Sequence, residues 1–169
     1  MHMLLTAVIG GVVIGAAISD AMTFRIPNAF PLILVGLFLV STITTMPTDA
    51  LLWHVVAGVA VLVAGMGLFA MNVIGGGDAK LLAAISLLAG PFLLMPLVMF
   101  ISLAGLALAL TVYLLRAIGV AAWLERRGMH GFAGGRMCPY GVAIAGGWVL
   151  LFVVLPALPH LIVIPASGG

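Results

Sequence analysis

Residues 81–115 carry no charged side chain. A single α-helix over this stretch would be about 52 Å long, whereas the hydrocarbon core of a bilayer is only about 30 Å thick. Two membrane spans would need a turn between them, and Gly90, Pro91 and Pro96 are helix breakers at a suitable place. We therefore expect a short span before these residues and a longer span after them, ending near Arg116.

The composition of the whole chain agrees with a membrane setting. Hydrophobic residues make up 65% of the chain and charged residues only 6%. In a soluble domain, about a quarter of all residues are charged. A nucleic-acid-binding protein would show a dense basic patch, and the six basic residues are spread from position 25 to position 136. The natural solvent of this chain is therefore lipid, and nucleic acid is not an expected partner.

Uncharged stretches also mark the other spans. Residues 3–19, 27–46 and 50–74 predict the first three spans, and residues 139–163 predict the last. With two spans from residues 81–115, we predict an all-α polytopic membrane protein of six transmembrane helices, forming one domain over residues 1–169. A cleaved signal peptide is the alternative for the first stretch, but no Lys or Arg precedes it.

The basic residues predict the orientation. With six spans, every Lys and Arg falls on the same side of the membrane, whereas five spans would divide them between the two sides. Cytoplasmic loops are enriched in Lys and Arg, so we expect the basic side to be cytoplasmic and both termini to be extracytoplasmic. The residues concerned are Arg25, Lys80, Arg116, Arg126, Arg127 and Arg136.

Two of the four acidic residues lie at the cytoplasmic ends of predicted spans. Asp20 ends the first span and Asp78 precedes the fourth. Ionisable groups against apolar helices are costly, so a functional role is the first hypothesis for both, and ordinary helix caps are the alternative. The run Gly75-Gly76-Gly77 before Asp78 can admit an extended peptide, or it can be a hinge before an N-cap aspartate.

Paired carboxylates suggest hydrolysis. Two carboxyl groups that share one proton can activate water with one group and polarise a carbonyl with the other. The sequence contains no HExxH or GxSxG motif and no phosphate-binding loop. Cys138 is the only cysteine, and the four histidines are not at ligand spacing. We therefore expect neither a metal nor a cofactor.

Three stretches resemble the type IV prepilin peptidases, in particular the short form that accompanies Tad/Flp pili. The stretch from Asp20 to Arg25-Ile26-Pro27-Asn28 is similar to the family's aspartate, basic segment and Ile-Pro-Asn. Gly75-Gly76-Gly77-Asp78 matches the family's GxGD motif, with Lys80 and an apolar helix after it. Pro139-Tyr140-Gly141 resembles the entry to the family's last helix.

The resemblance implies a function and a location. Asp20 and Asp78 would be the catalytic pair of an aspartic endopeptidase that cuts prepilin leaders after a glycine, at the cytoplasmic face of a bacterial or archaeal inner membrane. Its partners would be an Flp-like prepilin and lipid, with self-association left open. We expect no separate methyltransferase domain, so methyltransferase activity is doubtful and S-adenosylmethionine is not an expected cofactor.

Five further residues are candidates for supporting the pair. Gly75 and Gly77 would shape the backbone. Lys80 and Arg25 would stabilise the ionised aspartates, or equally well would anchor helix ends at the lipid headgroups. Asn28 would orient a carboxylate or cap the second helix, and capping is the favoured interpretation.

Two other functional classes fit an apolar chain of this kind. A small transporter or channel would use the glycine loop as a broken helix that binds an ion near the middle of the membrane. The position of both aspartates at span ends argues against this class. A non-catalytic pilus or secretion assembly factor would instead tolerate neutral replacements of either aspartate.

Overall fold

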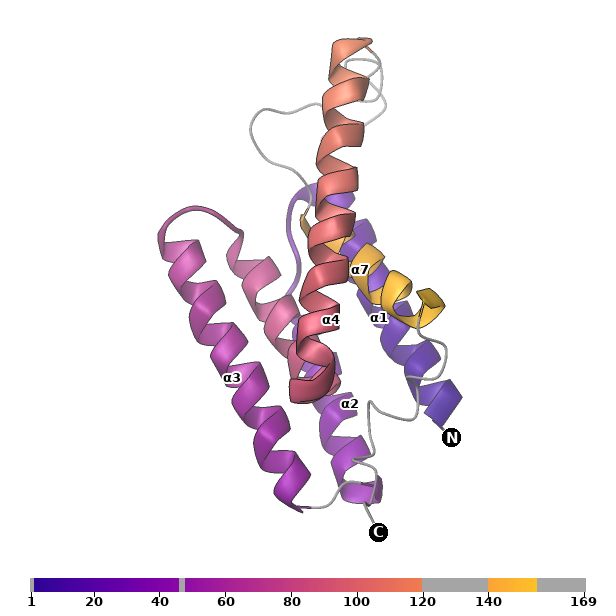
Figure 1. Cartoon of the computed structure of the whole chain (residues 1–169), viewed down its shortest axis with the longest axis vertical. Coiled ribbons are helices and arrows are strands. Elements are labelled where there is room, and N and C mark those ends of the chain that lie inside the picture. Colours follow the sequence, from indigo (N-terminus) through magenta and orange to yellow (C-terminus); the bar gives the residue numbers. More distant parts are fainter. Residues whose placement is uncertain (1, 46–47, 120–139, 155–169) are drawn as a thin grey trace.

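The computed structural model describes residues 2–45, 48–119 and 140–154, and this part of the chain is entirely helical apart from short connections (Figure 1). The predicted all-α class is thereby confirmed for the described residues. Its elements are α1 His2–Thr23, α2 Ala29–Thr45, α3 Thr48–Ala70, α4 Gly76–Ala117 and α7 Tyr140–Val154. The predicted loop residues Glu125, Arg126, Arg127, His130 and Arg136, and also Cys138, lie outside the described residues.

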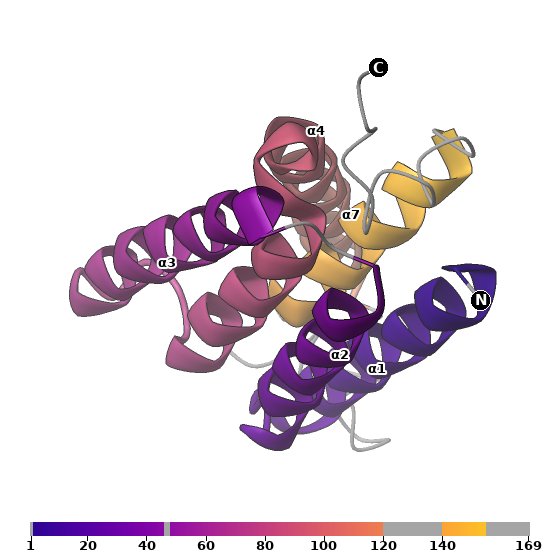
Figure 2. The same cartoon turned by 90° about the horizontal axis from the view of Figure 1, so that it is seen from below.

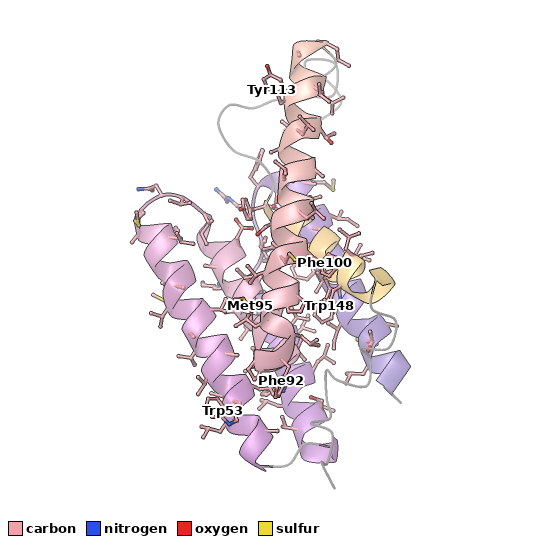
Figure 3. All side chains as sticks on the ribbon, viewed as in Figure 1. Trp53, Phe92, Met95, Phe100, Tyr113 and Trp148 are labelled. Atoms are coloured by element: carbon pink, nitrogen blue, oxygen red, sulfur yellow. The ribbon has the colours of Figure 1, made fainter. Side chains whose placement is uncertain are left out.

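Among the described residues, three helical segments are long and apolar enough to cross a membrane, and two shorter apolar helices accompany them. The three segments are Leu5–Thr23, Ala50–Ala70 and Gly76–Leu115. Large apolar side chains cover the outside of these helices. Trp53, Phe92, Met95 and Tyr113 point away from the bundle, whereas Trp148 is buried between helices (Figure 3). A monomeric soluble protein rarely exposes so much apolar surface, and lipid is the solvent that suits it.

The chain reverses its direction within α4, as the sequence predicts. Gly90 has a φ of 69° and a ψ of −179°, a left-handed conformation that favours glycine. Pro91 follows it and has no N–H to continue the helical ladder. Figure 1 shows the first half of α4 running down from the connection after α3 and the second half running back past it. Residues 76–89 span only about 21 Å, less than the hydrocarbon core.

His54 of α3 stabilises this reversal. Because Pro91 lacks an N–H, the carbonyl of Leu87 has no helical partner, and the Nδ1–H of His54 donates to that oxygen over 2.9 Å. The imidazole is buried, stacks on Phe38 at a centroid distance of 6.0 Å, and lies so close to Gly90 that a Cβ there would collide with it. His54 thus has a structural role that the sequence analysis did not anticipate.

We expect His54→Leu to be less stable than His54→Asn by about 1–3 kcal/mol, the cost of an unsatisfied buried polar group. Leucine and asparagine have similar shapes, but only the asparagine amide can still donate to the Leu87 carbonyl. The free energy of unfolding in mixed micelles, measured by denaturant titration, compares the two variants. Equal stability of the pair would mean that the bond to Leu87 contributes nothing.

The first half of α4 is the centre of the bundle. α2 and α3 both pack on α4 and make few contacts with each other, whereas α7 packs between α4 and α1 (Figure 2). Small residues allow close approach: a Cβ on Gly65 would come within 3.0 Å of Ala79 Cβ, and one on Gly147 within 2.6 Å of the Ile101 backbone. This packing brings the end of α1 to the starts of α4 and α7.

Candidate active site

Asp20 lies in the last turn of α1 and is only 5% exposed. The chain leaves the helix at Phe24, whose φ of 53° is left-handed and whose N–H donates to the Asp20 carbonyl over 2.8 Å. The hydroxyls of Ser19 and Thr23 then donate to the carbonyl of Arg25, over 2.9 and 3.3 Å. This turn fixes residues 24–28 beside the Asp20 side chain, as a left-handed residue commonly does at a helix end.

Asp78 is the third residue of α4 and not the N-cap residue that the sequence analysis considered. Gly75 precedes the helix, and its N–H donates to Asp78 Oδ2 over 3.2 Å. This is the side-chain half of a capping box, in which the residue at N3 accepts from the N-cap amide. The positive end of the helix dipole also lies at this carboxyl group.

Glycine is needed at positions 75 and 77 because neighbouring atoms approach the backbone closely, and not because the backbone adopts a positive φ. A Cβ on Gly75 would come within 2.7 Å of Asp78 Oδ2, and one on Gly77 within 3.0 Å of Ile26 Cβ. Neither glycine has a positive φ. The glycine run thus lets the first turn of α4 pack directly on the segment that follows α1.

The start of α7 completes the surroundings of Asp20. The N–H of Gly141 donates to Asp20 Oδ2 over 2.8 Å, across 121 positions of the sequence. A Cβ on Gly141 would lie 3.0 Å from the same oxygen and 3.1 Å from Ile26 Cδ1. The stretch Pro139-Tyr140-Gly141 predicts the start of a helix, whereas its contact with the aspartate follows only from how the helices pack.

Both aspartates line one cavity of about 400 Å³ and interact electrostatically. Asp78 Oδ1 is buried and has no hydrogen-bond partner among the described residues. The cavity is large enough for several water molecules, each of which occupies about 30 Å³ in the liquid. Its lining residues are Asp20, Phe24, Arg25, Ile26, Pro27, Asn28, Gly75, Gly76, Gly77 and Asp78.

Four of the five supporting candidates line this cavity, namely Arg25, Asn28, Gly75 and Gly77. Lys80 lines a separate groove, and its Nζ donates to Asn28 Oδ1 over 3.0 Å. Within residues 2–45 and 48–119, no ion pair joins Lys80 or Arg25 to either aspartate. Asn28 does precede α2, but its side-chain oxygen bonds to Lys80 rather than to a helix N–H.

The described residues contain no group of three His, Cys, Asp or Glu side chains that could hold a metal ion. What the cavity offers instead is a pair of carboxyl groups, each fixed by a backbone N–H. Such a pair can hold a water molecule against a peptide carbonyl and exchange protons with both.

One family model matches more than half of the chain. The model of the type IV leader peptidase family matches residues 7–110, a range that holds both aspartates and ends before α7. Neither a curated protein nor a solved structure matches the chain.

Proposed function

Because the chain belongs to the type IV leader peptidase family, we propose that it removes the leader peptides of Flp-like type IV prepilins, using Asp20 and Asp78 to activate water. Membership of the family makes the chain a peptidase, and its apolar helices make it an integral membrane protein. The dyad, the Flp-like substrate and the side of the membrane are the parts that we add.

One observation carries the proposal. Asp20 and Asp78 come from different helices, yet their carboxyl groups line the same cavity. Each is held by a backbone N–H, from Gly141 for Asp20 and from Gly75 for Asp78. The Gly75 bond is a helix cap, whereas the Gly141 bond joins Asp20 to a third element, which a plain helix cap would not need.

The two carboxyl groups would act as a unit that carries one proton. The ionised group takes a proton from water while the oxygen of that water bonds to the carbonyl carbon, and the protonated group donates to the carbonyl oxygen. The tetrahedral intermediate then breaks its C–N bond as a proton passes to the leaving nitrogen. Asp78 Oδ1 is buried and has no hydrogen-bond partner among the described residues, so no other protein group competes for its lone pairs.

We further propose that the chain crosses the membrane six times, with both termini outside and the dyad at the cytoplasmic face. The reversal at Gly90 supports two crossings by α4. The position of Asp20 in the last turn of α1 and of Asp78 in the first turn of α4 supports one common side. Arg25 and Lys80, which follow these aspartates closely, agree with the cytoplasmic side.

A cleavage assay tests the proposed function. The wild-type chain, reconstituted in phospholipid vesicles with an Flp-like prepilin, is expected to release a leader that ends in glycine, as detected by mass spectrometry. A chelator should leave the rate unchanged, because carboxyl groups alone perform the proposed chemistry. An intact prepilin in the presence of folded protein would contradict the proposal, and ion flux through the same vesicles would favour a transporter.

A further inference from the structure

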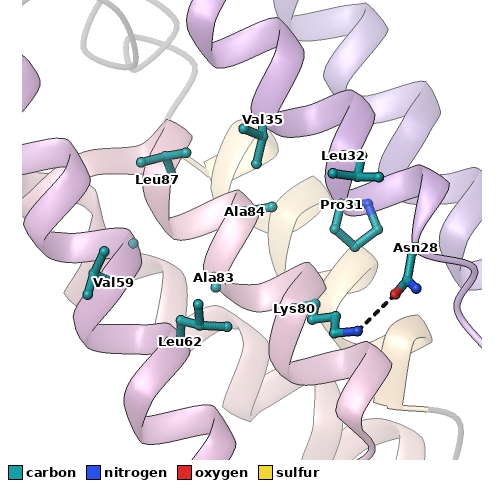
Figure 4. A pocket seen from close by; sticks show the side chains of 11 residues that line it. Asn28, Pro31, Leu32, Val35, Val59, Leu62, Lys80, Ala83, Ala84 and Leu87 are labelled. Atoms are coloured by element: carbon teal, nitrogen blue, oxygen red, sulfur yellow. Dashed lines mark hydrogen bonds between the residues drawn. The ribbon is translucent and has the colours of Figure 1, made fainter.

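A second hollow lies next to the cavity of the dyad. It is a groove of about 480 Å³ between α2 and α3, with the first half of α4 as its floor (Figure 4). Its walls are apolar except at one end, where Lys80 bonds to Asn28. The groove is lined by Asn28, Pro31, Leu32, Val35, Gly58, Val59, Leu62, Lys80, Ala83, Ala84 and Leu87.

We infer that this groove binds the apolar helix of the substrate, the segment that follows the cleaved bond. The inference rests on the proposed function, since it names where one part of that substrate lies. It assigns the groove to a membrane-embedded peptide helix rather than to lipid or to a second copy of the chain.

Continuity with the dyad is the first argument. Asn28 lines both the groove and the cavity of Asp20 and Asp78. From Lys80 to Leu87 the groove follows α4 for seven residues, or about 10 Å, away from the dyad and toward the turn at Gly90. A substrate cut between the aspartates and continuing into the membrane would enter the groove at Asn28.

The shape of the groove suits a helix. Between helices in lipid there is no hydrophobic driving force, so association depends on close packing at small residues. Ala83 and Ala84 form the floor, while Leu32 and Val59 stand on opposite walls (Figure 4). α2 and α3 do not close over the groove. Two turns of a substrate helix can therefore place one row of side chains between these two helices.

The polar end of the groove suits the beginning of such a helix. Lys80 Nζ and the Asn28 amide lie where the substrate would pass from the cavity into the groove. Free carbonyl and N–H groups occur where a peptide leaves its extended form, and these two side chains can bond to them. A lipid acyl chain has no polar groups of this kind that could bond to Lys80 or Asn28.

Tryptophan substitutions on the walls test the assignment. Leu32 and Val59 are 68% and 52% exposed, so a larger side chain can be placed there without disturbing the core. Leu32→Trp and Val59→Trp are each expected to slow cleavage of the full prepilin at least tenfold, through a higher KM. Both should cut a truncated peptide, which has the leader and cleavage site but no apolar helix, at the wild-type rate.

Neighbouring positions on the same two helices provide matched controls. Ile33 and Val63 are 48% and 65% exposed and do not line the groove. Ile33→Trp and Val63→Trp should leave cleavage of both substrates within twofold of wild type. If the wall variants also cut the full prepilin at the wild-type rate, lipid or nothing occupies the groove and the inference is overturned.

Cross-linking gives a test that does not depend on cleavage. With Cys138 replaced by serine, Val59→Cys is expected to form a disulfide with a cysteine placed in the apolar helix of the prepilin, and Val63→Cys is not. No cross-link, or equal cross-linking at both positions, would reject the groove even if cleavage proceeds. A disulfide between two copies at Val59→Cys without prepilin would assign the groove to self-association instead. Failure of the wild-type chain to cleave would count against the proposed function alone.

Discussion

Replacing Asp20 or Asp78 by asparagine is expected to reduce leader cleavage about a thousandfold or more in each case. A carboxamide can neither take a proton from water nor donate one to the carbonyl oxygen, and general acid–base catalysis of this kind contributes 10²–10⁴-fold. Asparagine keeps the shape of aspartate, and its oxygen can still accept from the N–H of Gly141 or Gly75. The fold should therefore survive, and the rate under single-turnover conditions measures the chemistry.

Comparison with other variants separates catalysis from folding. Asp49→Asn removes the same charge from the third aspartate and should cleave at the wild-type rate. The double variant D20N/D78N should be no slower than the slower single variant, because groups that act as a unit do not contribute additively. Substantial cleavage by either single variant would exclude the dyad, and the assembly-factor interpretation would then gain support.

Gly141→Ala is expected to lower kcat by about a hundredfold with little change in KM. The added Cβ would lie 3.0 Å from both Cβ and Oδ2 of Asp20 and 3.1 Å from Ile26 Cδ1, so the carboxyl group or the start of α7 must move. A misplacement of about 1 Å can cost a factor of about 10² in rate. On the proposed dyad, Gly141 would be a positioning residue, which acts through Asp20 and not on the substrate.

Gly146→Ala provides the control on the same helix. Its Cβ would meet Ala104 Cβ at 3.2 Å, which tightens the packing of α7 on α4 without touching Asp20. We expect similar thermal stability for the two alanine variants and near-normal kcat for Gly146→Ala only. Equal losses of kcat in both would show that a general shift of α7, rather than the contact with Asp20, limits the rate.

Much of the helix arrangement could be predicted from the spacing of charges and breakers. Because lipid penalises charge, the ten charged residues divide the chain into apolar segments, and α1, α2 and α3 follow those segments closely. The reversal at Gly90 was predictable since glycine and proline act through local backbone geometry. The same charge pattern predicts six crossings and two extracytoplasmic termini, and both of these stay predictions.

Contacts between residues that lie far apart in the chain could not be predicted from the sequence. His54 bonds to a carbonyl that Pro91 leaves free, but nothing near His54 in the sequence reveals that partner. The acceptor of the Gly141 N–H, and the bond between Lys80 and Asn28, likewise depend on how helices pack. Charge patterns therefore located both aspartates at helix ends, whereas only the packed structure could reveal which groups hold them.

The bond from Gly141 to Asp20 has a consequence for how the protein matures in the cell. Because the donor lies 121 positions after the acceptor, a ribosome has made most of the chain before the two can meet. A nascent chain with its first helices already inserted would still lack the amide that orients Asp20. If the dyad acts as proposed, Asp20 should thus reach its catalytic orientation only after α7 has been inserted.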